Sequence, residues 1–279
     1  MNCEDVILRI RIELKDYLLK NRSLKSLVCG VSGGIDSALC VTLSKPVCDE
    51  LGLKLIGVSL PIISNKMDEI DRAIEVGRTF CHEFNEDVKL EFAYKTMFDL
   101  LQIIDNNDSK SEKIRKGNIK ARLRMIYLYN LAFVNKGMVL STDNYTELLL
   151  GFWTRHGDEG DFGMIQYLFK TEVYEIAKFL ENEFRKQQKI KEADALQHCI
   201  DAVPTDGLGV SNSDLEQFGT NSYDETEEIL KTWISWPGYE DKNKIQFANH
   251  SVVLQYEKTH FKRAGCISIN REHVFKRLM

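Results

Sequence analysis

Hydrophobic positions along the chain follow two periods, and each change of period marks a change of element. Near the N-terminus Val6, Ile10, Leu14 and Leu18 recur at helical spacing, which indicates an amphipathic helix. Short apolar runs at 27–31, 53–60 and 138–140 are typical of buried strands, and 88–92 alternates like a further strand.

Helical periodicity returns between these strands. It covers 38–43, 68–84, 96–105, 119–134, the residues from Asp143 onward, 171–189 and 224–233. Pro46 is expected to end or kink the helix that contains it. Alternating strands and helices predict an α/β fold, a doubly wound parallel sheet with helices on both faces. In such a sheet, ligands bind beyond the carboxyl ends of the strands.

Composition narrows the class of protein. The 279 residues include 37 Lys and Arg against 42 Asp and Glu, a net charge of -5, which argues against a nucleic-acid or membrane-surface binder. No apolar run approaches the roughly 18 residues of a spanning helix, and no secretory signal is visible. The 7 cysteines form no Cys-x-x-Cys pair, which favours a reducing compartment. We therefore expect a cytoplasmic protein. A chain of this length can form one large α/β domain or two small ones, and we expect one domain over residues 1–279.

Two later regions differ in charge. An acidic, glycine-containing stretch near 206–223 predicts a flexible loop, and 258–279 holds six bases against one acid. Both are consistent with a solvated charged surface, and both are consistent with flaps over an anionic ligand that the basic segment would contact.

The segment between the first strand and the next helix carries the strongest chemical pattern. It consists of Gly30, Val31, Ser32, Gly33, Gly34, Ile35, Asp36 and Ser37. Adjacent glycines let backbone N–H groups approach a ligand, and the following helix N-terminus adds further donors. Together with the serine hydroxyls they form a cradle for phosphate or pyrophosphate. Asp36 would repel phosphate unless Mg²⁺ bridged the two, so the loop also predicts Mg²⁺.

This loop is neither a Walker A motif nor a dinucleotide-binding Gly-x-Gly-x-x-Gly, and a plain tight turn is the alternative. It resembles the pyrophosphate loop of the N-type ATP pyrophosphatases, which have an adenine nucleotide alpha-hydrolase-like, Rossmann-like fold. Within that group the chain resembles the ammonia-dependent NAD synthetase family. The likeness is carried by blocks at 117–125 (GNIKARLRM), 141–147 (STDNYTE), 151–154 (GFWT), 157–161 (GDEGD), 170–173 (KTEV) and 203–206 (VPTD).

The resemblance implies a role for each matching residue. The loop 30–37, Thr142, Lys170 and Thr205 would bind ATP, and Asp36 and Glu147 would hold Mg²⁺. Arg122, Arg155, Asp161 and Lys262 would bind deamido-NAD. Asp158 would serve the ammonia site, so that Asp36, Asp158 and Lys170 form the catalytic set. The resemblance also implies a homodimer. The alternatives without the resemblance are a surface or salt-bridged arginine for Arg122, a helix-surface carboxylate for Glu147 and a loop-capping carboxylate for Asp158.

Three departures from the family pattern concern the acceptor. Arg155 stands where the family has Lys, the loop 157–161 is one residue short, and Phe261 replaces the His before Lys262.

The resemblance as a whole implies an NAD synthetase that amidates deamido-NAD through an acyl-adenylate and releases AMP and pyrophosphate. The donor would be free ammonia, because a single helix precedes the first strand. The alternatives are another adenylating amide ligase of the same group, a tRNA-modifying relative, which the acidity disfavours, or a degenerate nucleotide-binding module.

Overall fold

The strands of the protein form one sheet in which every described pairing is parallel. The structure, a computed structural model, describes residues 1–63, 65–86, 88–101, 109–204, 215, 218–239, 244–265 and 268–270. Within these residues the strand order is β3-β2-β1-β4, which confirms the parallel α/β fold that the periodicity predicts. The strands are β1 (Ser26–Gly30), β2 (Lys54–Val58), β3 (Glu83–Asn85) and β4 (Gly137–Val139).

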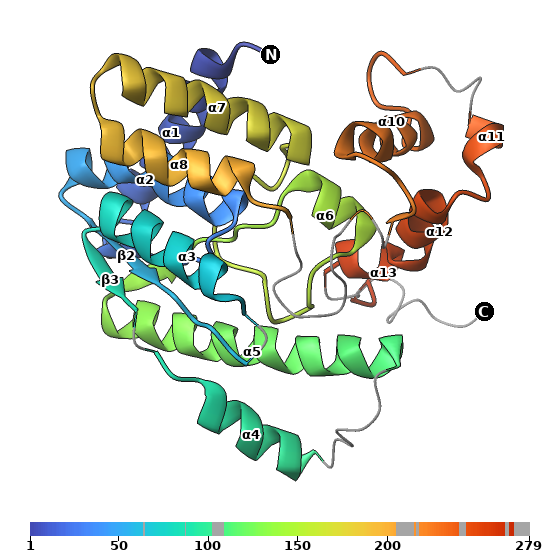
Figure 1. The fold of residues 1–279 in the computed structure, drawn as a ribbon, viewed down its shortest axis with the longest axis horizontal. Helices are drawn as coiled ribbons and strands as arrows, with labels where there is room; N and C mark the ends of the chain where they lie inside the picture. Colours follow the sequence, from blue (N-terminus) through green and yellow to red (C-terminus); the bar gives the residue numbers. More distant parts are fainter. Residues whose placement is uncertain are drawn as a thin grey trace.

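Helices cover both faces of this sheet (Figure 1). On one side lie α1 (Cys3–Lys20), α2 (Ile35–Leu51), α3 (Met67–Phe80), α7 (Lys170–Lys186) and α8 (Ile190–Asp201). On the other lies α5 (Lys110–Val134), with α4 (Glu91–Leu100) beyond it. The short α6 (Tyr145–Leu150) follows β4, and a C-terminal group contains α10 (Tyr223–Trp233), α11 (Lys244–Phe247), α12 (Ser251–Lys258) and α13 (His260–Arg263).

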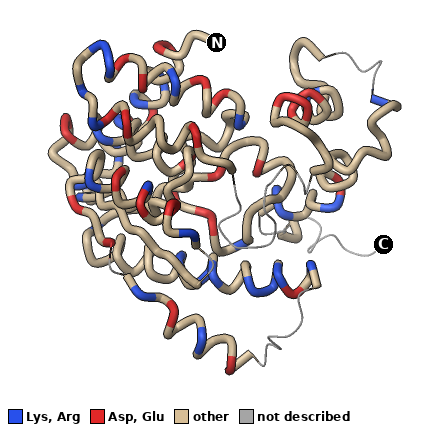
Figure 2. Tube along the Cα trace, viewed as in Figure 1, with Lys and Arg blue, Asp and Glu red and all other residues tan. Residues whose placement is uncertain are grey.

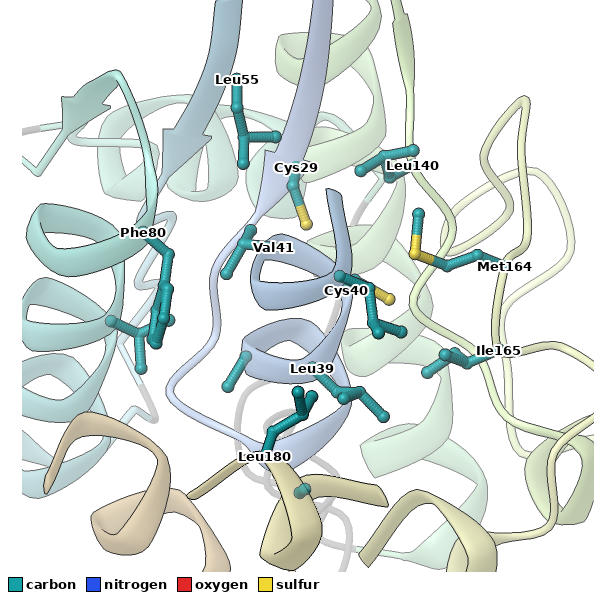
Figure 3. Packing of buried hydrophobic residues seen from close by; sticks show 14 of the residues in the cluster. Cys29, Leu39, Cys40, Val41, Leu55, Phe80, Leu140, Met164, Ile165 and Leu180 are labelled. Atoms are coloured by element: carbon teal, nitrogen blue, oxygen red, sulfur yellow. The ribbon is translucent and has the colours of Figure 1, made fainter. Parts of the chain in front are cut away.

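The two faces of the sheet are separated by the alternation of side chains along each strand. Leu27 and Cys29 of β1 join the core beneath α2, which Figure 3 shows around Cys40 and Leu39. Val28, between them, belongs to the core beneath α5. Both cores bury their strand residues, which explains why β1 reads as a continuous apolar run.

A third, smaller core joins the C-terminal helices to the rest. Leu149 and Leu150 of α6 and Phe169 pack with Leu230 of α10 and Val253 of α12. This cluster places α10 beside the start of α7, as Figure 1 shows.

The strand predicted at 88–92 is wrong. The edge position beside β2 is taken by β3, where Ile56 pairs with Glu83 and Val58 with Asn85. Residues 88–90 carry no strand, and α4 begins at Glu91. Val88 and Leu90 nevertheless pack against the core beneath α5. Their alternation therefore reflects burial of loop side chains, since the ladder ends before them.

The structure adds further differences among the helices. α2 continues through Pro46 to Leu51, because Leu43, Val47 and Cys48 around the proline are fully or nearly buried and outweigh one missing hydrogen bond. α8 was not expected, since its buried face is built largely from small residues such as Ala193 and Ala195. In the part of the chain that the structure describes, no helix is long and apolar enough to traverse a bilayer. Most of the acidic stretch, 205–214, and the last residues, 271–279, lie outside it.

Candidate active site

The loop after β1 is braced by its two serines. The Ser32 backbone N–H donates to Ser37 Oγ at 3.2 Å, the Gly34 N–H donates to Ser32 Oγ at 3.2 Å, and Ser37 Oγ donates to the Gly34 carbonyl at 3.1 Å. Gly34 caps α2 without any side chain, so the N-terminal amides of this helix stay available for an anion.

Gly33 is the position where glycine is required. Its φ of +82° lies in the left-handed region, and a Cβ there would collide with the backbone oxygen of Glu69. The guanidinium of Arg72 donates to the Gly33 carbonyl at 3.0 Å. α3 therefore holds the turn of the loop from behind.

Asp36, in the first turn of α2, meets α6 through a buried asparagine. Asn144 Nδ2 donates to Asp36 Oδ1 at 3.0 Å, while Asn144 Oδ1 accepts from the Glu147 N–H at 3.0 Å. Glu147 returns a carboxylate oxygen to the Asn144 N–H at 3.3 Å, which completes a capping box. One cap thus brings the carboxylates of Asp36 and Glu147 to the same point beyond the sheet.

Lys170, the first residue of α7, lies between these carboxylates. Its ammonium hydrogen-bonds to Asp36 Oδ2 and lies 3.4 Å from Glu147 Oε1. Burial alone would lower the pKa of Lys170, but the charges of Asp36 and Glu147 hold it well above its usual value. The two carboxylates therefore stabilise the ammonium form of Lys170.

Two further carboxyls, those of Asp143 and Asp158, line the same region. Burial, followed by the charges of Asp158 and Glu147, raises the pKa of Asp143 well above its usual value. Burial also raises the pKa of Asp158, opposed by the Thr154 N–H, which donates to it at 2.6 Å, and by the charges of Arg124 and Lys262. The site thus combines the positive charge of Lys170 with two carboxyls whose pKa values are raised by burial.

These groups line one cavity of about 590 Å³. Every residue of the loop 30–37 lines it, together with the predicted residues Thr142, Glu147, Asp158, Lys170 and Lys262. Thr205 lies outside the described residues. The cavity is found beyond the carboxyl ends of β1 and β4, where a doubly wound sheet binds its ligands.

The remaining predicted acceptor residues lie outside the cavity lining. Arg122 is exposed and donates to the Arg155 carbonyl at 3.3 Å, while Arg155 donates to the carbonyls of Phe261 and Gly265. Asp161 accepts from the Val139 N–H at 2.8 Å and from the Tyr129 hydroxyl at 3.1 Å. The role of these three in acceptor binding stays a prediction.

Sequence reasoning did not single out some residues that the structure brings into the cavity. Asp143, which lines the cavity, was not predicted as a site residue. Its position in the block 141–147, between Thr142 and Glu147, could have indicated that it lies in the site. Arg124, a residue of the block 117–125, is half-buried, donates to the Leu60 carbonyl and to Asn65 Oδ1 at 2.9 Å each, and lines the cavity.

Comparisons with known proteins agree with this geometry. The family model described as NAD synthase matches residues 6–266. An NH(3)-dependent NAD(+) synthetase of Thermoplasma acidophilum is 32% identical over 231 residues, covering 82% of this chain and 86% of that protein. One of Finegoldia magna is 33% identical over 229 residues, covering 82% and 83%. A solved structure of NMN synthetase from Francisella tularensis matches with a TM-score of 0.76 at 25% identity, covering 97% of this chain and 99% of that chain. The chain therefore belongs to the NAD synthase family, whose curated relatives are ligases.

Proposed function

We propose that this enzyme activates the nicotinate carboxylate of deamido-NAD with ATP, releases pyrophosphate, and transfers ammonia to the acyl-adenylate to give NAD and AMP. The observation that carries the proposal is the meeting of Asp36, Glu147 and Lys170 beside the loop 30–37 in one cavity. A phosphate chain laid along that loop would place its pyrophosphate against these charges.

The donor set fits Mg²⁺. Asp36 and Glu147 supply hard carboxylate oxygens that share one partner, Lys170 Nζ. Within the described residues no three acidic, histidine or cysteine side chains gather closely enough to hold a metal alone, so phosphate oxygens and water would complete the shell. When bound there, the ion would neutralise the charge that develops on the leaving pyrophosphate.

The protein's own groups act by position and charge. Lys170 offers a fixed positive charge, and the backbone N–H groups at the start of α2 would donate hydrogen bonds to the anion, so no covalent intermediate on the protein is required. Cys199, a thiol of the cavity, is unsuited to nucleophilic attack because burial raises its pKa to about 12. Asp158 would take the proton that the ammonia nitrogen loses on forming the amide, and its raised pKa makes it a better proton acceptor.

The products of the reaction test this proposal. Purified protein incubated with ATP, Mg²⁺, ammonium and deamido-NAD should form AMP, pyrophosphate and NAD in equal amounts. Chromatography separates and quantifies the nucleotides, and a pyrophosphate assay measures the other product. Formation of ADP and inorganic phosphate would overturn it, since the bond cleaved would then lie beyond the β-phosphorus.

A mononucleotide acceptor is a second candidate. It is suggested by the matching structure named NMN synthetase, and the departures at Arg155, at Phe261 and in the loop 157–161 concern the acceptor rather than ATP. The same experiment with nicotinate mononucleotide decides between the two, because the preferred acceptor has the higher kcat/KM at saturating ATP.

We also propose that residues 1–279 act as one domain in a cytoplasmic homodimer. Hydrogen bonds from Thr171 of α7 to Glu227 of α10 support a single unit. The described cysteines, all free, are compatible with a reducing compartment. Phe133 and Val134 at the end of α5 are exposed and would suit a subunit contact. Sedimentation at micromolar concentration tests the dimer.

A further inference from the structure

A buried glutamate of α10 lies outside the groups that the proposed chemistry uses. Glu227 is 1% exposed, although carboxylates are rarely buried without partners. Its oxygens accept hydrogen bonds from the Thr146 hydroxyl at 2.9 Å, from the Thr171 N–H at 3.0 Å and from the Thr171 hydroxyl. Lys231, one turn later, lies 3.5 Å from it. Glu227 is thus a fully used acceptor between three helices.

These partners are the sequence neighbours of the site residues. Thr146 precedes Glu147 on α6, and Thr171 follows Lys170 on α7. The Thr146 hydroxyl donates a hydrogen bond to Glu227. Its oxygen can still accept, and the Lys170 N–H donates to this oxygen at 3.0 Å. A continuous chain therefore runs from the Glu227 carboxylate through Thr146 to the backbone of Lys170.

The same contacts satisfy the first turn of α7. The N–H groups of Lys170 and Thr171 are among those that no helix can pair internally. Both receive acceptors here, one directly from Glu227 and one through Thr146. A carboxylate at this end also matches the positive end of the helix dipole. In Figure 1 the start of α7 faces α10, which carries this cap from the C-terminal group of helices.

We propose that Glu227 is a positioning residue of the reaction. By capping α7 and accepting a hydrogen bond from Thr146 of α6, it fixes the Lys170 ammonium against Asp36 and Glu147. The inference rests on the proposed function for its kinetic test. A shift of α7 by a fraction of an ångström would move the Lys170 charge relative to the phosphates, and such misplacement costs on the order of 10-fold to 100-fold in rate.

The kinetic test compares Glu227→Gln with Glu228→Gln. Glu228 is the exposed neighbour on the same helix, so the control removes the same charge without touching the chain of contacts. We expect kcat for pyrophosphate release to fall about 10-fold in Glu227→Gln, with a smaller change in KM for ATP, and to stay at the wild-type value in Glu228→Gln. Equal kcat in the two variants would overturn the proposal.

Thr146→Val provides a second route should Glu227→Gln fold poorly. Valine keeps the buried shape of Thr146 but cannot connect Glu227 to the Lys170 N–H. We expect a similar loss in kcat, and a double variant no slower than the slower single one, because both substitutions break one chain. Losses in kcat that multiply in the double variant would show that the two residues act independently. A fall in melting temperature with kcat unchanged would show a structural role alone, and either result would overturn the proposal.

A third measurement is independent of the reaction. Reductive methylation followed by peptide mass spectrometry reports how far each lysine amine is protected. Lys170 should be protected in the wild type and in Glu228→Gln, and labelled several-fold faster in Glu227→Gln. Unchanged protection would overturn the positioning role even if the acceptor or the overall reaction proved to be different, whereas loss of protection would support it in a protein without the proposed activity.

Discussion

The ammonium of Lys170 hydrogen-bonds to the carboxylate of Asp36 across a sequence separation of 134 residues. The contact joins the first turn of α7 to the first turn of α2, and both side chains are largely buried. Two helix N-termini thereby face one cavity with opposite charges between them, an arrangement suited to a polyanion that arrives with a divalent cation.

Removal of Asp36 should damage the chemical step more than nucleotide binding. We expect Asp36→Ala to lower kcat by about 10²-fold or more, because one fixed charge of the pyrophosphate site is lost. Single-turnover pyrophosphate release and ATP affinity by calorimetry separate the two effects. Asp36→Asn serves as the control, since it keeps the acceptor for Asn144. Near-normal turnover in Asp36→Ala would refute the role.

Lys170→Met should have two opposite effects. Pyrophosphate release should fall by about 10²-fold, since a preorganised charge is removed. Binding of Mn²⁺ without nucleotide, measured by electron paramagnetic resonance, should tighten by about 10-fold, because Asp36 and Glu147 lose their competing cation. Lys178→Met, on the exposed side of the same helix, is the control. Weaker Mn²⁺ binding in Lys170→Met would contradict a shared position of lysine and metal.

Gly33→Ala and Gly52→Ala separate strain from collision. Both glycines have positive φ, +82° and +65°, so each alanine should cost about 1–2 kcal/mol of unfolding free energy. Nothing lies within 4 Å of a Cβ at Gly52, whereas one at Gly33 meets the Glu69 backbone. Gly33→Ala should therefore lose about 1–3 kcal/mol more and also weaken ATP binding. Urea unfolding measures the free energy of unfolding of both variants. Equal losses would show that α3 moves away from the added methyl group at Gly33.

The stability of Asp143→Asn should depend on pH. Burial, then the charge of Asp158, raises the pKa of Asp143 well above its ordinary value of 3.8. A carboxyl whose pKa is higher in the folded chain stabilises the fold fully below the unfolded pKa, and this contribution is lost as pH rises through the folded pKa. Asn stays neutral, so the variant should gain melting temperature relative to wild type as pH rises above about 4. The exposed Asp16→Asn should show no such trend; a flat difference for Asp143→Asn would mean that its carboxyl ionises freely.

Arg122→Ala tests the acceptor assignment. If Arg122 contacts the acceptor, its loss should raise the acceptor KM by about 10-fold and leave the KM for ATP unchanged, as expected for one charged hydrogen bond. Folding should be unaffected, since the side chain is exposed. Arg124→Ala should instead lower the melting temperature, because the Leu60 carbonyl and Asn65 Oδ1 lose a half-buried donor. An unchanged acceptor KM in Arg122→Ala would remove this residue from the site.

Local pattern was sufficient for much of the fold. The continuous apolar run at 27–31 and the helical spacing of 68–84 predicted β1 and α3, because a strand buried on both faces is apolar throughout and a helix buried on one face leaves its period in the sequence. The same rule misplaced a strand at 88–92, where buried loop side chains alternate without pairing. The register of β2 against β3 decides which residues form the edge strand, and that register is set across 27 residues of chain.

The sequence by itself determined the loop 30–37 with Asp36, because a glycine-rich turn and a helix start carry their chemistry in one short block, and the family resemblance of the block 141–147 added Glu147 as the candidate partner of Asp36. Only the tertiary structure decided which charges meet. Lys170 hydrogen-bonds to Asp36, Asn144 donates to the same carboxylate, and Glu227 caps α7 from another group of helices. These contacts form because the packing of three separate cores brings distant helix ends together. Periodicity records which face of an element is buried but does not specify its partner, and the partners define this site.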